Sequence, residues 1–257
     1  MIKIMPILMP ILRPIARQLL SAIIPSRCLL CGQVHEGSFI LICAGCYHDL
    51  PHIRHACERC GLPIFEASAR SISQANTCGS CLKNPPPFRR AIAPLLYAPP
   101  IDRRVAAFKY NQQLISGQLL SQLLLQSIQR HYQNQALPDL IIPVPLHWSR
   151  LLKRGYNQSL CIAQYLACEL QIPIGKNHLL RHRRTLSQQG LTRQERQHNL
   201  INAFTLKKPL AGETIALIDD VMTTGATAAE ITRTLKRAGA GAVDVWTLAR
   251  TPSPNAF

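Results

Sequence analysis

Apolar and polar positions alternate along most of the chain with two different periods. Short, nearly continuous apolar runs predict buried strands at residues 91–97, 140–144, 214–218 and 242–248. Longer runs with apolar residues three and four apart predict helical segments at residues 101–131, 157–170 and 227–238. Because strands alternate with helices, the pattern indicates the α/β class, with a mainly parallel sheet flanked by helices.

The first third of the chain has a different pattern. Residues 28–84 contain eight of the ten cysteines and few long periodic runs, so something other than a large apolar core must hold this region. A short amphipathic segment, residues 1–27, precedes it, and three consecutive prolines at residues 85–87 form a stiff break after it. We therefore predict a small cysteine-rich module over residues 28–84 and an α/β domain over residues 88–257.

The eight cysteines of this module form four Cys-x-x-Cys pairs. Two residues between thiolates allow both sulfurs to bind one ion, and two such pairs complete a closed tetrahedral zinc site, which is structural because no position is left for a catalytic water. Eight ligands suffice for two Zn²⁺ ions. The simplest pairing is in order, Cys28, Cys31, Cys43 and Cys46, then Cys57, Cys60, Cys78 and Cys81, although an interleaved pairing fits the same spacing.

Metal binding by thiolates is favoured in a reducing compartment. The longest apolar stretch near the start, residues 4–12, is interrupted by Pro6 and Pro10 and is too short for a membrane helix, and no secretory signal pattern follows it. We therefore expect a cytoplasmic protein without a membrane span. Disulfides or metal-free thiols are the alternative for the four pairs. The two remaining cysteines, Cys161 and Cys168, are seven apart on a predicted helix, which favours core thiols.

The most informative segment is residues 214–230, where an apolar strand leads to Asp219 and Asp220, then to a Thr/Gly loop and a helix. Backbone N–H groups of such a loop and of the helix N-terminus can receive a phosphate, and glycine permits its close approach. The carboxylates can accept hydrogen bonds from ribose hydroxyls or stabilise positive charge on a sugar ring. The predicted phosphate loop consists of Thr223, Thr224, Gly225, Ala226 and Thr227.

The same segment has a simpler alternative. Thr227 and Glu230 match a T-x-x-E capping box, which would make the segment an ordinary capped helix after a buried strand. A capping box does not account for two adjacent acids at the carboxyl end of a strand, where open α/β sheets bind ligands. The Walker A and G-x-G-x-x-G patterns are absent from the sequence.

Composition and charge narrow the class of ligand. Hydrophobic residues make up 47% of the 257 residues and charged residues 16%, which is typical of a folded chain. Lysine and arginine number 29 against 13 acids, a formal net charge of +16 at pH 7. Such an excess predicts attraction to polyanions, whether phosphate ligands, nucleic acid or anionic lipid.

Several blocks of the sequence resemble a known family. Residues 215–227 look like the phosphoribosyl pyrophosphate (PRPP) motif of type I phosphoribosyltransferases, and together with the Cys-x-x-Cys region the whole chain resembles the ComF family of competence-associated proteins. Residues 143–145 with 153–158, and the block 183–204, are similar to further family blocks. An earlier block, Phe108-Lys109-Tyr110, is also similar, although Asn111 stands where the family pattern has glycine.

The resemblance implies a type I phosphoribosyltransferase-like fold preceded by a double zinc ribbon. It implies that Asp219 and Asp220 are the catalytic pair that meets the ribose hydroxyls and that the loop from Thr223 to Thr227 wraps the 5′-phosphate. Pyrophosphate and Mg²⁺ would be handled by other loops, to which we assign Lys109, Arg154 and Gly155, with Arg183 and Arg184 on a mobile closing loop within residues 181–199.

The function implied is phosphoribosyl transfer, a pentosyl transfer by a glycosyltransferase, with an acceptor that the sequence does not identify. The family name implies a part in natural transformation and in handling incoming DNA, with other DNA-uptake proteins as partners. Two alternatives stay open: a PRPP or nucleotide sensor without turnover, and a single-stranded DNA-binding factor that uses the zinc ribbons and the basic residues. Aromatic residues at 5% argue against an extensive base-stacking platform.

Overall fold

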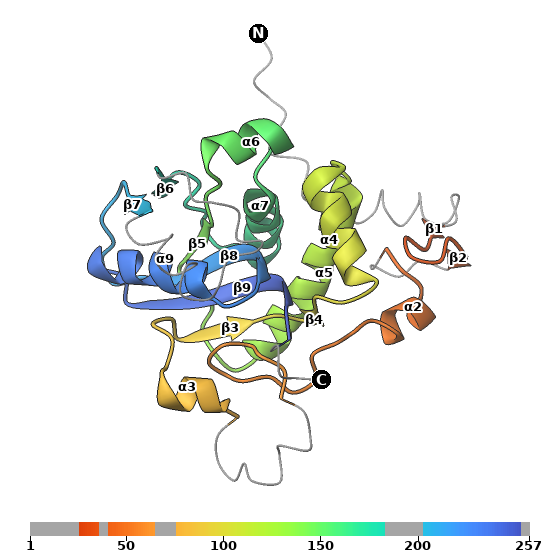
Figure 1. The fold of residues 1–257 in the computed structure, drawn as a ribbon, viewed down its shortest axis with the longest axis horizontal. Coiled ribbons are helices and arrows are strands. Elements are labelled where there is room, and N and C mark those ends of the chain that lie inside the picture. The colour runs from red at the N-terminus through yellow and green to blue at the C-terminus, as the bar shows by residue number, and fades with distance from the viewer. Residues whose placement is uncertain (1–25, 36–40, 65–75, 183–202, 253–257) are drawn as a thin grey trace. The chain divides into compact units, whose positions relative to one another are not determined.

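The computed structural model describes residues 26–35, 41–64, 76–182 and 203–252. The chain divides into two compact units, Met1–Leu50 and Pro51–Phe257, whose helices and strands are labelled in Figure 1. This division falls inside the cysteine-rich region and assigns the first four cysteines to the smaller unit and the next four to the larger one. The boundary at residues 85–87 stays a prediction.

The smaller unit is built around a short antiparallel pair and one helical turn. Strand β1 (Ser26–Arg27) pairs with β2 (Val34–His35), and helix α2 covers Ala44–His48. Cys43 is the N-cap of α2, and its Sγ accepts a hydrogen bond from the Cys46 backbone N–H. The predicted amphipathic segment at residues 1–27 lies almost entirely outside the described residues.

The larger unit contains a parallel sheet with strand order β3-β9-β8-β5. A short strand, β4, also pairs with β9 in parallel. The confirmed prediction of a parallel sheet follows from the apolar runs, since such strands are buried on both faces. The strands are β3 (Arg90–Ile92), β4 (Leu95–Leu96), β5 (Leu140–Pro143), β8 (Thr214–Met222) and β9 (Ala242–Arg250).

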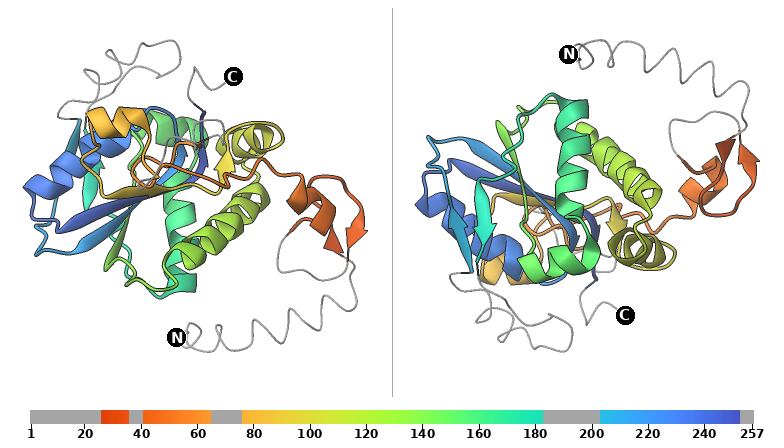
Figure 2. Two further views of the ribbon diagram at one scale, coloured as in Figure 1. Left: turned by 90° about the horizontal axis from the view of Figure 1, so that it is seen from below. Right: turned by 90° about the horizontal axis from the view of Figure 1, so that it is seen from above.

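Helices cover both faces of this sheet (Figure 2). Alternate residues of β8 and β9 point to opposite faces: Ile215 and Val243 belong to the core cluster with α9, whereas Trp246 packs against Tyr132 at the end of α5. The helices of this unit are α3 (Gly79–Lys83), α4 (Ile101–Tyr110), α5 (Leu114–His131), α6 (Trp148–Arg154), α7 (Gln158–Leu170) and α9 (Ala226–Arg237).

The helical character predicted for residues 101–131 is confirmed, and the chain forms two helices there, α4 and α5. The break lies at residues 111–113, where Gln112 has φ of 54°. A Cβ on Gly117 of α5 would lie 2.4 Å from the Phe108 ring of α4, so glycine allows the two helices to approach closely. The turn coincides with a polar run, Asn111-Gln112-Gln113, that interrupts the apolar positions of the two helices.

Near the predicted site the structure differs from two features expected from the sequence, the end of the strand and the N-cap of the helix. Strand β8 continues to Met222, so Asp219 and Asp220 lie within the strand rather than after it. Helix α9 begins at Ala226 with Gly225 as N-cap at φ of 77° and no side-chain cap, so the capping box on Thr227 is wrong. The left-handed conformation at the N-cap is one that glycine adopts without strain.

The second half of the cysteine-rich region is joined to the sheet. The Ile53 N–H donates to the Pro94 carbonyl, the Leu96 N–H donates to the Pro51 carbonyl, and His52 forms a bridge with Leu95. The residues just before the second cysteine cluster therefore extend alongside β4.

Cys168 is exposed, whereas Cys161 is partly buried, so the expectation of two core thiols on α7 is wrong for Cys168. Cys168 lies on the solvent side of an amphipathic helix. None of the helices in the described ranges has the length and apolar character needed to cross a bilayer.

Candidate functional site

The predicted acidic pair lies at the carboxyl end of β8 and is joined there by a lysine from α4. Lys109 Nζ is 2.9 Å from Asp220 Oδ1, and the side chains of both residues are less than a fifth exposed. Each carboxylate also accepts a local backbone hydrogen bond, Asp219 Oδ1 from the Asp220 N–H at 2.8 Å and Asp220 Oδ1 from the Val221 N–H at 2.6 Å. The structure therefore brings together three of the residues that the sequence proposes.

Burial of the pair changes its protonation. Burial and then repulsion from Asp220 raise the pKa of Asp219 to about 7, although the Asp220 N–H, Lys109 and Arg181 act in the opposite direction. Burial alone would lower the pKa of Lys109, but attraction to Asp220 and Asp219 outweighs it and raises the pKa. A carboxyl group that titrates near neutral pH beside a buried cation is typical of a functional site.

The predicted phosphate loop follows directly. Thr224 is exposed and the other four loop residues are partly exposed, so packed side chains do not seal the loop. A Cβ on Gly225 would lie 2.7 Å from Met222 Cε, and the glycine therefore lets the loop close over β8. Thr224 Oγ1 accepts from the Ala226 N–H at 3.3 Å. The first turn of α9 leaves further N–H groups without intrahelical acceptors, which is the arrangement that binds anions.

Arginines surround the acidic pair. Arg154 lies 5.0 Å from the centre of the Tyr110 ring and donates to Gln158 Oε1 at 3.1 Å. Gly155 ends α6 at φ of 80°, so the chain turns immediately after this arginine. Repulsion from Arg154 opposes the raised pKa of Lys109, so Arg154 lies near the lysine that contacts Asp220, and Gly155 follows it in the chain.

The sequence interpretation missed two arginines of this group. Burial and then Arg154 lower the pKa of Arg150, while burial and then Arg150 lower the pKa of Arg181 to about 10. Attraction to Asp220 and to Asp219, respectively, opposes these shifts. Arg150 is four residues before Arg154 on one helix, a spacing that could have identified it.

Arg183 and Arg184 lie outside the described residues, as does most of the predicted mobile loop. Residues 183–202 are bracketed by β6 (Leu179–Arg181) and β7 (Phe204–Leu206), which pair in antiparallel register. The role of the two arginines remains a prediction.

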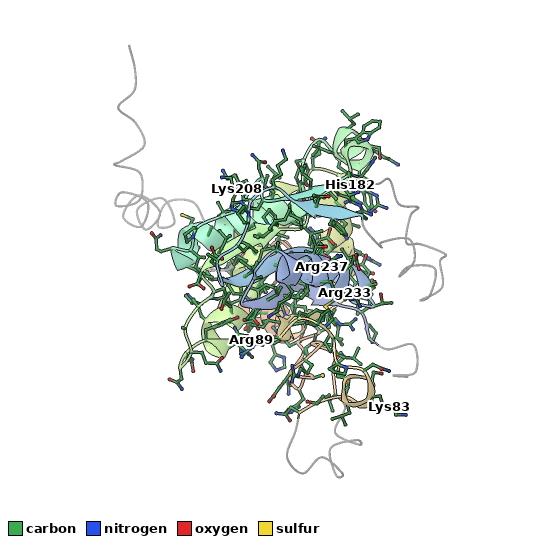
Figure 3. The ribbon with its side chains drawn as sticks, turned by 90° about the vertical axis from the view of Figure 1, so that its left-hand side faces the viewer. Lys83, Arg89, His182, Lys208, Arg233 and Arg237 are labelled. Carbon is green, nitrogen blue, oxygen red and sulfur yellow. The ribbon has the colours of Figure 1, made fainter. Side chains whose placement is uncertain are left out.

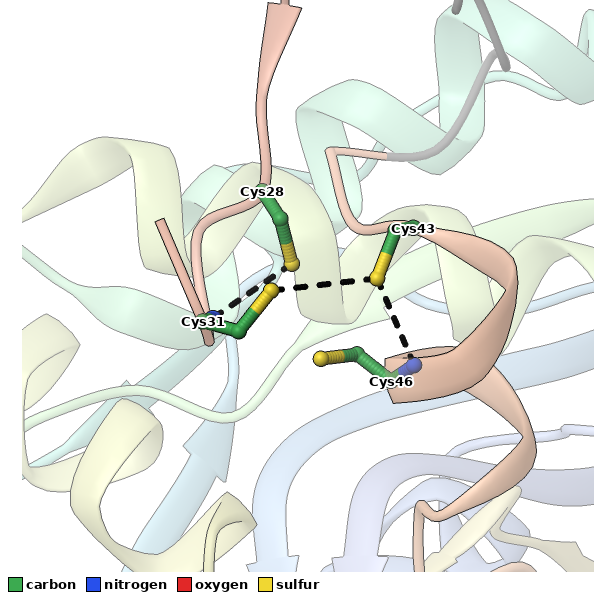
Figure 4. Close-up of side chains that lie close together, drawn as sticks. All are labelled: Cys28, Cys31, Cys43 and Cys46. Carbon is green, nitrogen blue, oxygen red and sulfur yellow. Dashed lines mark hydrogen bonds between the residues drawn. The ribbon is translucent and has the colours of Figure 1, made fainter. Parts of the chain in front are cut away.

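The eight Cys-x-x-Cys cysteines form two clusters. In each cluster the four Sγ atoms lie within 4.8 Å of one another, and Figure 4 shows the first. Cys31 Sγ is 3.9 Å from Cys43 Sγ, and Cys60 Sγ is 3.7 Å from Cys78 Sγ. Sulfurs at about 2.3 Å from a tetrahedral zinc are about 3.8 Å apart, so both clusters fit Zn²⁺.

The clusters confirm the in-order pairing and exclude the interleaved one. In the part of the chain that is described, both ligand sets consist of cysteine alone. Backbone N–H groups donate to sulfurs in both, for example Cys46 N to Cys43 Sγ at 3.5 Å and Cys78 N to Cys57 Sγ at 3.2 Å. Such bonds stabilise thiolates, as a structural metal site requires.

A pocket of about 640 Å³ lies away from the acidic strand end. It is bounded by the residues around Cys57, by β3 and by the last turn of α5 at His131. Of the predicted site residues only Cys57 lines it. The pocket and the acidic pair therefore lie at different places on the larger unit. We place the candidate site by its chemistry, because ligands of open parallel sheets bind at the carboxyl ends of strands.

Comparison with known proteins agrees with this organisation. A double zinc ribbon domain model matches residues 19–82. The DNA utilization protein YhgH of Escherichia coli K12 is 36% identical over 230 residues, covering 89% of this chain and 98% of that protein. Competence protein F of Haemophilus influenzae is 34% identical over 230 residues, covering 87% and 96%. The chain belongs to the ComF family.

Matches to solved structures are weaker. The purine phosphoribosyltransferase of Pyrococcus horikoshii aligns with a TM-score of 0.32 and 18% identity over 65% of this chain and 82% of that one. The orotate phosphoribosyltransferase of Aeropyrum pernix aligns with a TM-score of 0.33 and 16% identity over 55% and 75%. These scores carry no argument about the activity of this ComF-family chain.

Metal content tests the two clusters. We expect two zinc ions per chain by mass spectrometry of the purified protein, and one in Cys31→Ser. Cys57→Ser should lose one zinc and also destabilise the larger unit by about 3 kcal/mol or more, because Cys57 is fully buried there. Cys168→Ser, at an exposed cysteine, should keep both ions. Retention of both ions in either cluster variant would contradict the assignment.

The raised pKa of Asp219 has a consequence for stability. The folded protein keeps this proton up to about pH 7, whereas an unfolded aspartate loses it near pH 3.8, so the group lowers stability as pH rises through this window. Asp219→Asn should therefore be more stable than wild type by about 2 kcal/mol at pH 8, with a smaller difference at pH 5.

Urea denaturation of both proteins at the two pH values measures this difference. Glu169→Gln, which removes an exposed carboxylate from α7, controls for the loss of one negative charge. An Asp219→Asn effect that is equal at both pH values would show that the carboxyl is ionised throughout.

Proposed function

We propose that this chain binds PRPP, with Mg²⁺, at the carboxyl end of β8. The observation that carries the proposal is the buried contact between Lys109 and Asp220 beside Asp219, at the point where β8 leads into an unsealed Thr/Gly loop. The acids would accept hydrogen bonds from the ribose hydroxyls, and the loop and the first turn of α9 would receive the 5′-phosphate.

The diphosphate of such a ligand needs positive charge. Lys109, Arg150, Arg154 and Arg181 act electrostatically on the acidic pair or on one another, so they form one basic group around it. Mg²⁺, bound with the ligand, would neutralise further charge on the leaving pyrophosphate. The arginines would orient the diphosphate and keep it near the site.

The reaction that this arrangement supports is transfer of the phosphoribosyl group to a nitrogen acceptor. The bond from C1 of the ribose to the pyrophosphate oxygen breaks with both electrons leaving on pyrophosphate, and the lone pair of the acceptor forms the new bond. Positive charge that develops on the ring is stabilised by the Asp219 and Asp220 carboxylates. Binding without release of pyrophosphate would instead make the chain a PRPP sensor.

Relatives of this chain are named for DNA utilization and competence. We propose by analogy that it acts in the cytoplasm on incoming DNA or its breakdown products, together with other DNA-uptake proteins. A reducing compartment would also keep both cysteine clusters able to bind metal.

Calorimetry with PRPP and Mg²⁺ tests the binding site. Replacement of both Asp219 and Asp220 by Asn should weaken binding by at least about 100-fold, because two hydrogen-bond acceptors lose their charge. The zinc content should stay at its original level. Pyrophosphate release over a panel of nitrogen bases then separates a transferase from a sensor.

A control aspartate lies just before β5, where it contacts the first residue of β8. Asp139 Oδ2 accepts from the Thr214 N–H at 2.8 Å, and Asp139→Asn should bind PRPP as wild type does. Unchanged affinity in the Asp219 and Asp220 variant would place the ligand elsewhere or exclude it.

A second candidate function is binding of single-stranded DNA. Figure 3 shows a face of the larger unit on which basic side chains come from α3, from α9, from the residue before β3 and from the residues just after β6 and β7. We call this set the basic face, and all of its labelled members are exposed: Lys83, Arg89, His182, Lys208, Arg233 and Arg237. Such a surface suits a phosphate backbone, with affinity that falls steeply with salt.

Charge reversal tests the basic face. Lys208→Glu combined with Arg237→Glu should lower affinity for an oligothymidylate at least about tenfold at 50 mM salt and reduce the slope of log affinity against log salt. The control combines Arg103→Glu with Arg130→Glu, two exposed arginines on α4 and α5. An equal loss in both proteins would indicate only net charge, and no affinity at low salt would remove this function.

A further inference from the structure

Arg250 connects the second cysteine cluster with the predicted phosphate loop. It is the last residue of β9 and is 5% exposed. Its Nε donates to the Cys60 carbonyl at 3.2 Å. Its Nη1 donates to the Met222 carbonyl at 3.1 Å and also to the Thr223 carbonyl. One side chain therefore contacts the backbone of a zinc ligand and the first residue of the loop.

Within the described ranges, the charge of Arg250 has no carboxylate partner. None of the ion pairs among the described residues includes it. A buried cation is costly unless an opposite charge compensates it.

The second cluster can supply the missing counter-charge. Four thiolates around one Zn²⁺ would leave an excess of two negative charges close to Arg250. Loss of metal would remove the knuckle geometry that positions the Cys60 carbonyl, which accepts a hydrogen bond from Arg250 Nε.

Close packing limits how far the zinc knuckle and the phosphate loop can move. Gly61 follows Cys60 at φ of 65°, and a Cβ on it would lie 3.0 Å from the Ala91 carbonyl oxygen of β3. On the loop side, Phe88 is almost fully buried, and its ring lies 3.9 Å from the position of a Cβ on Gly225. The zinc knuckle therefore packs against β3, and the loop packs against Phe88, two residues before β3.

We propose that Arg250 is a positioning residue that couples the second tetracysteine site to the phosphate loop. Metal at the cluster orders the backbone at Met222 and Thr223, and ligand bound at the loop slows loss of metal from the cluster. The second effect follows from the first because coupling between two binding equilibria is reciprocal. The effect of bound ligand on metal loss rests on the proposed function, whereas the effect of metal on the loop backbone does not.

Zinc release to a chromogenic chelator tests the coupling with ligand. In Cys31→Ser, which keeps only the second cluster, saturating PRPP with Mg²⁺ should slow release about tenfold. In the same background, Arg250→Met should release zinc at about the same rate with and without PRPP, a ratio of about one. Tyr132→Phe removes another buried hydrogen bond to β9, from Tyr132 to Asp244 at 2.5 Å, and should keep the tenfold ratio.

Hydrogen exchange tests the coupling without ligand. Amides of residues 223–229 should exchange about tenfold faster after zinc is removed from Cys31→Ser, while amides of α7 stay protected. In Arg250→Met the loop should exchange fast with or without zinc. If that variant does not fold, Arg250→Lys keeps the charge with fewer donors and should show an intermediate response.

The outcomes separate the two proposals. Loop exchange that is the same with and without zinc overturns the coupling, whether or not PRPP binds. A PRPP effect on zinc release that persists in Arg250→Met also overturns the role of this residue. Failure of PRPP to bind the zinc-loaded wild type defeats the proposed function alone, and hydrogen exchange then decides the coupling.

Discussion

Two adjacent carboxylates held with little water at the end of β8 are the constraint on which the candidate site depends. Their burial and mutual repulsion keep Asp219 protonated to about pH 7, and Lys109 reaches across from α4 to compensate Asp220. Like charges placed together reduce the stability of the folded chain. A bound ligand would offset this loss of stability, because its hydroxyl groups or positive charge would interact favourably with both acids.

Metal–thiolate bonds take the place of a core in the cysteine-rich region. Pairs of cysteines two residues apart specify a tetrahedral centre locally, so few apolar residues are needed around it. The two clusters nevertheless have different surroundings within their own units. Cys31 of the first is exposed, whereas Cys57 of the second is fully buried beside strands of the sheet. The second cluster contacts a buried cation, Arg250, which also contacts the backbone at the carboxyl end of β8.

Positive charge is used in two ways in the larger unit. Around the acidic pair, Arg150 and Arg181 are partly desolvated, which lowers their pKa and makes each a strong donor to a bound anion. On the basic face the side chains are exposed, as Arg237 and Lys208 are, and their attraction is long-ranged and screened by salt. A small phosphorylated ligand suits the first setting and a polyanion suits the second, so one chain can carry both without sharing residues.

Features that depend on neighbouring residues in the chain could be predicted from the sequence alone. Spacing within each Cys-x-x-Cys pair predicted the ligands, apolar runs predicted the buried strands, and the order of strands and helices predicted a parallel sheet. The acids and the Thr/Gly loop were found because they are consecutive in the chain. Only the tertiary structure decided that Lys109 meets Asp220, that α4 and α5 are separate helices, and that Arg250 joins Cys60 to Thr223. The physical reason is that a local pattern reports which face of an element is buried, whereas the counter-charge of a buried ion comes from segments that become neighbours only after the sheet has formed.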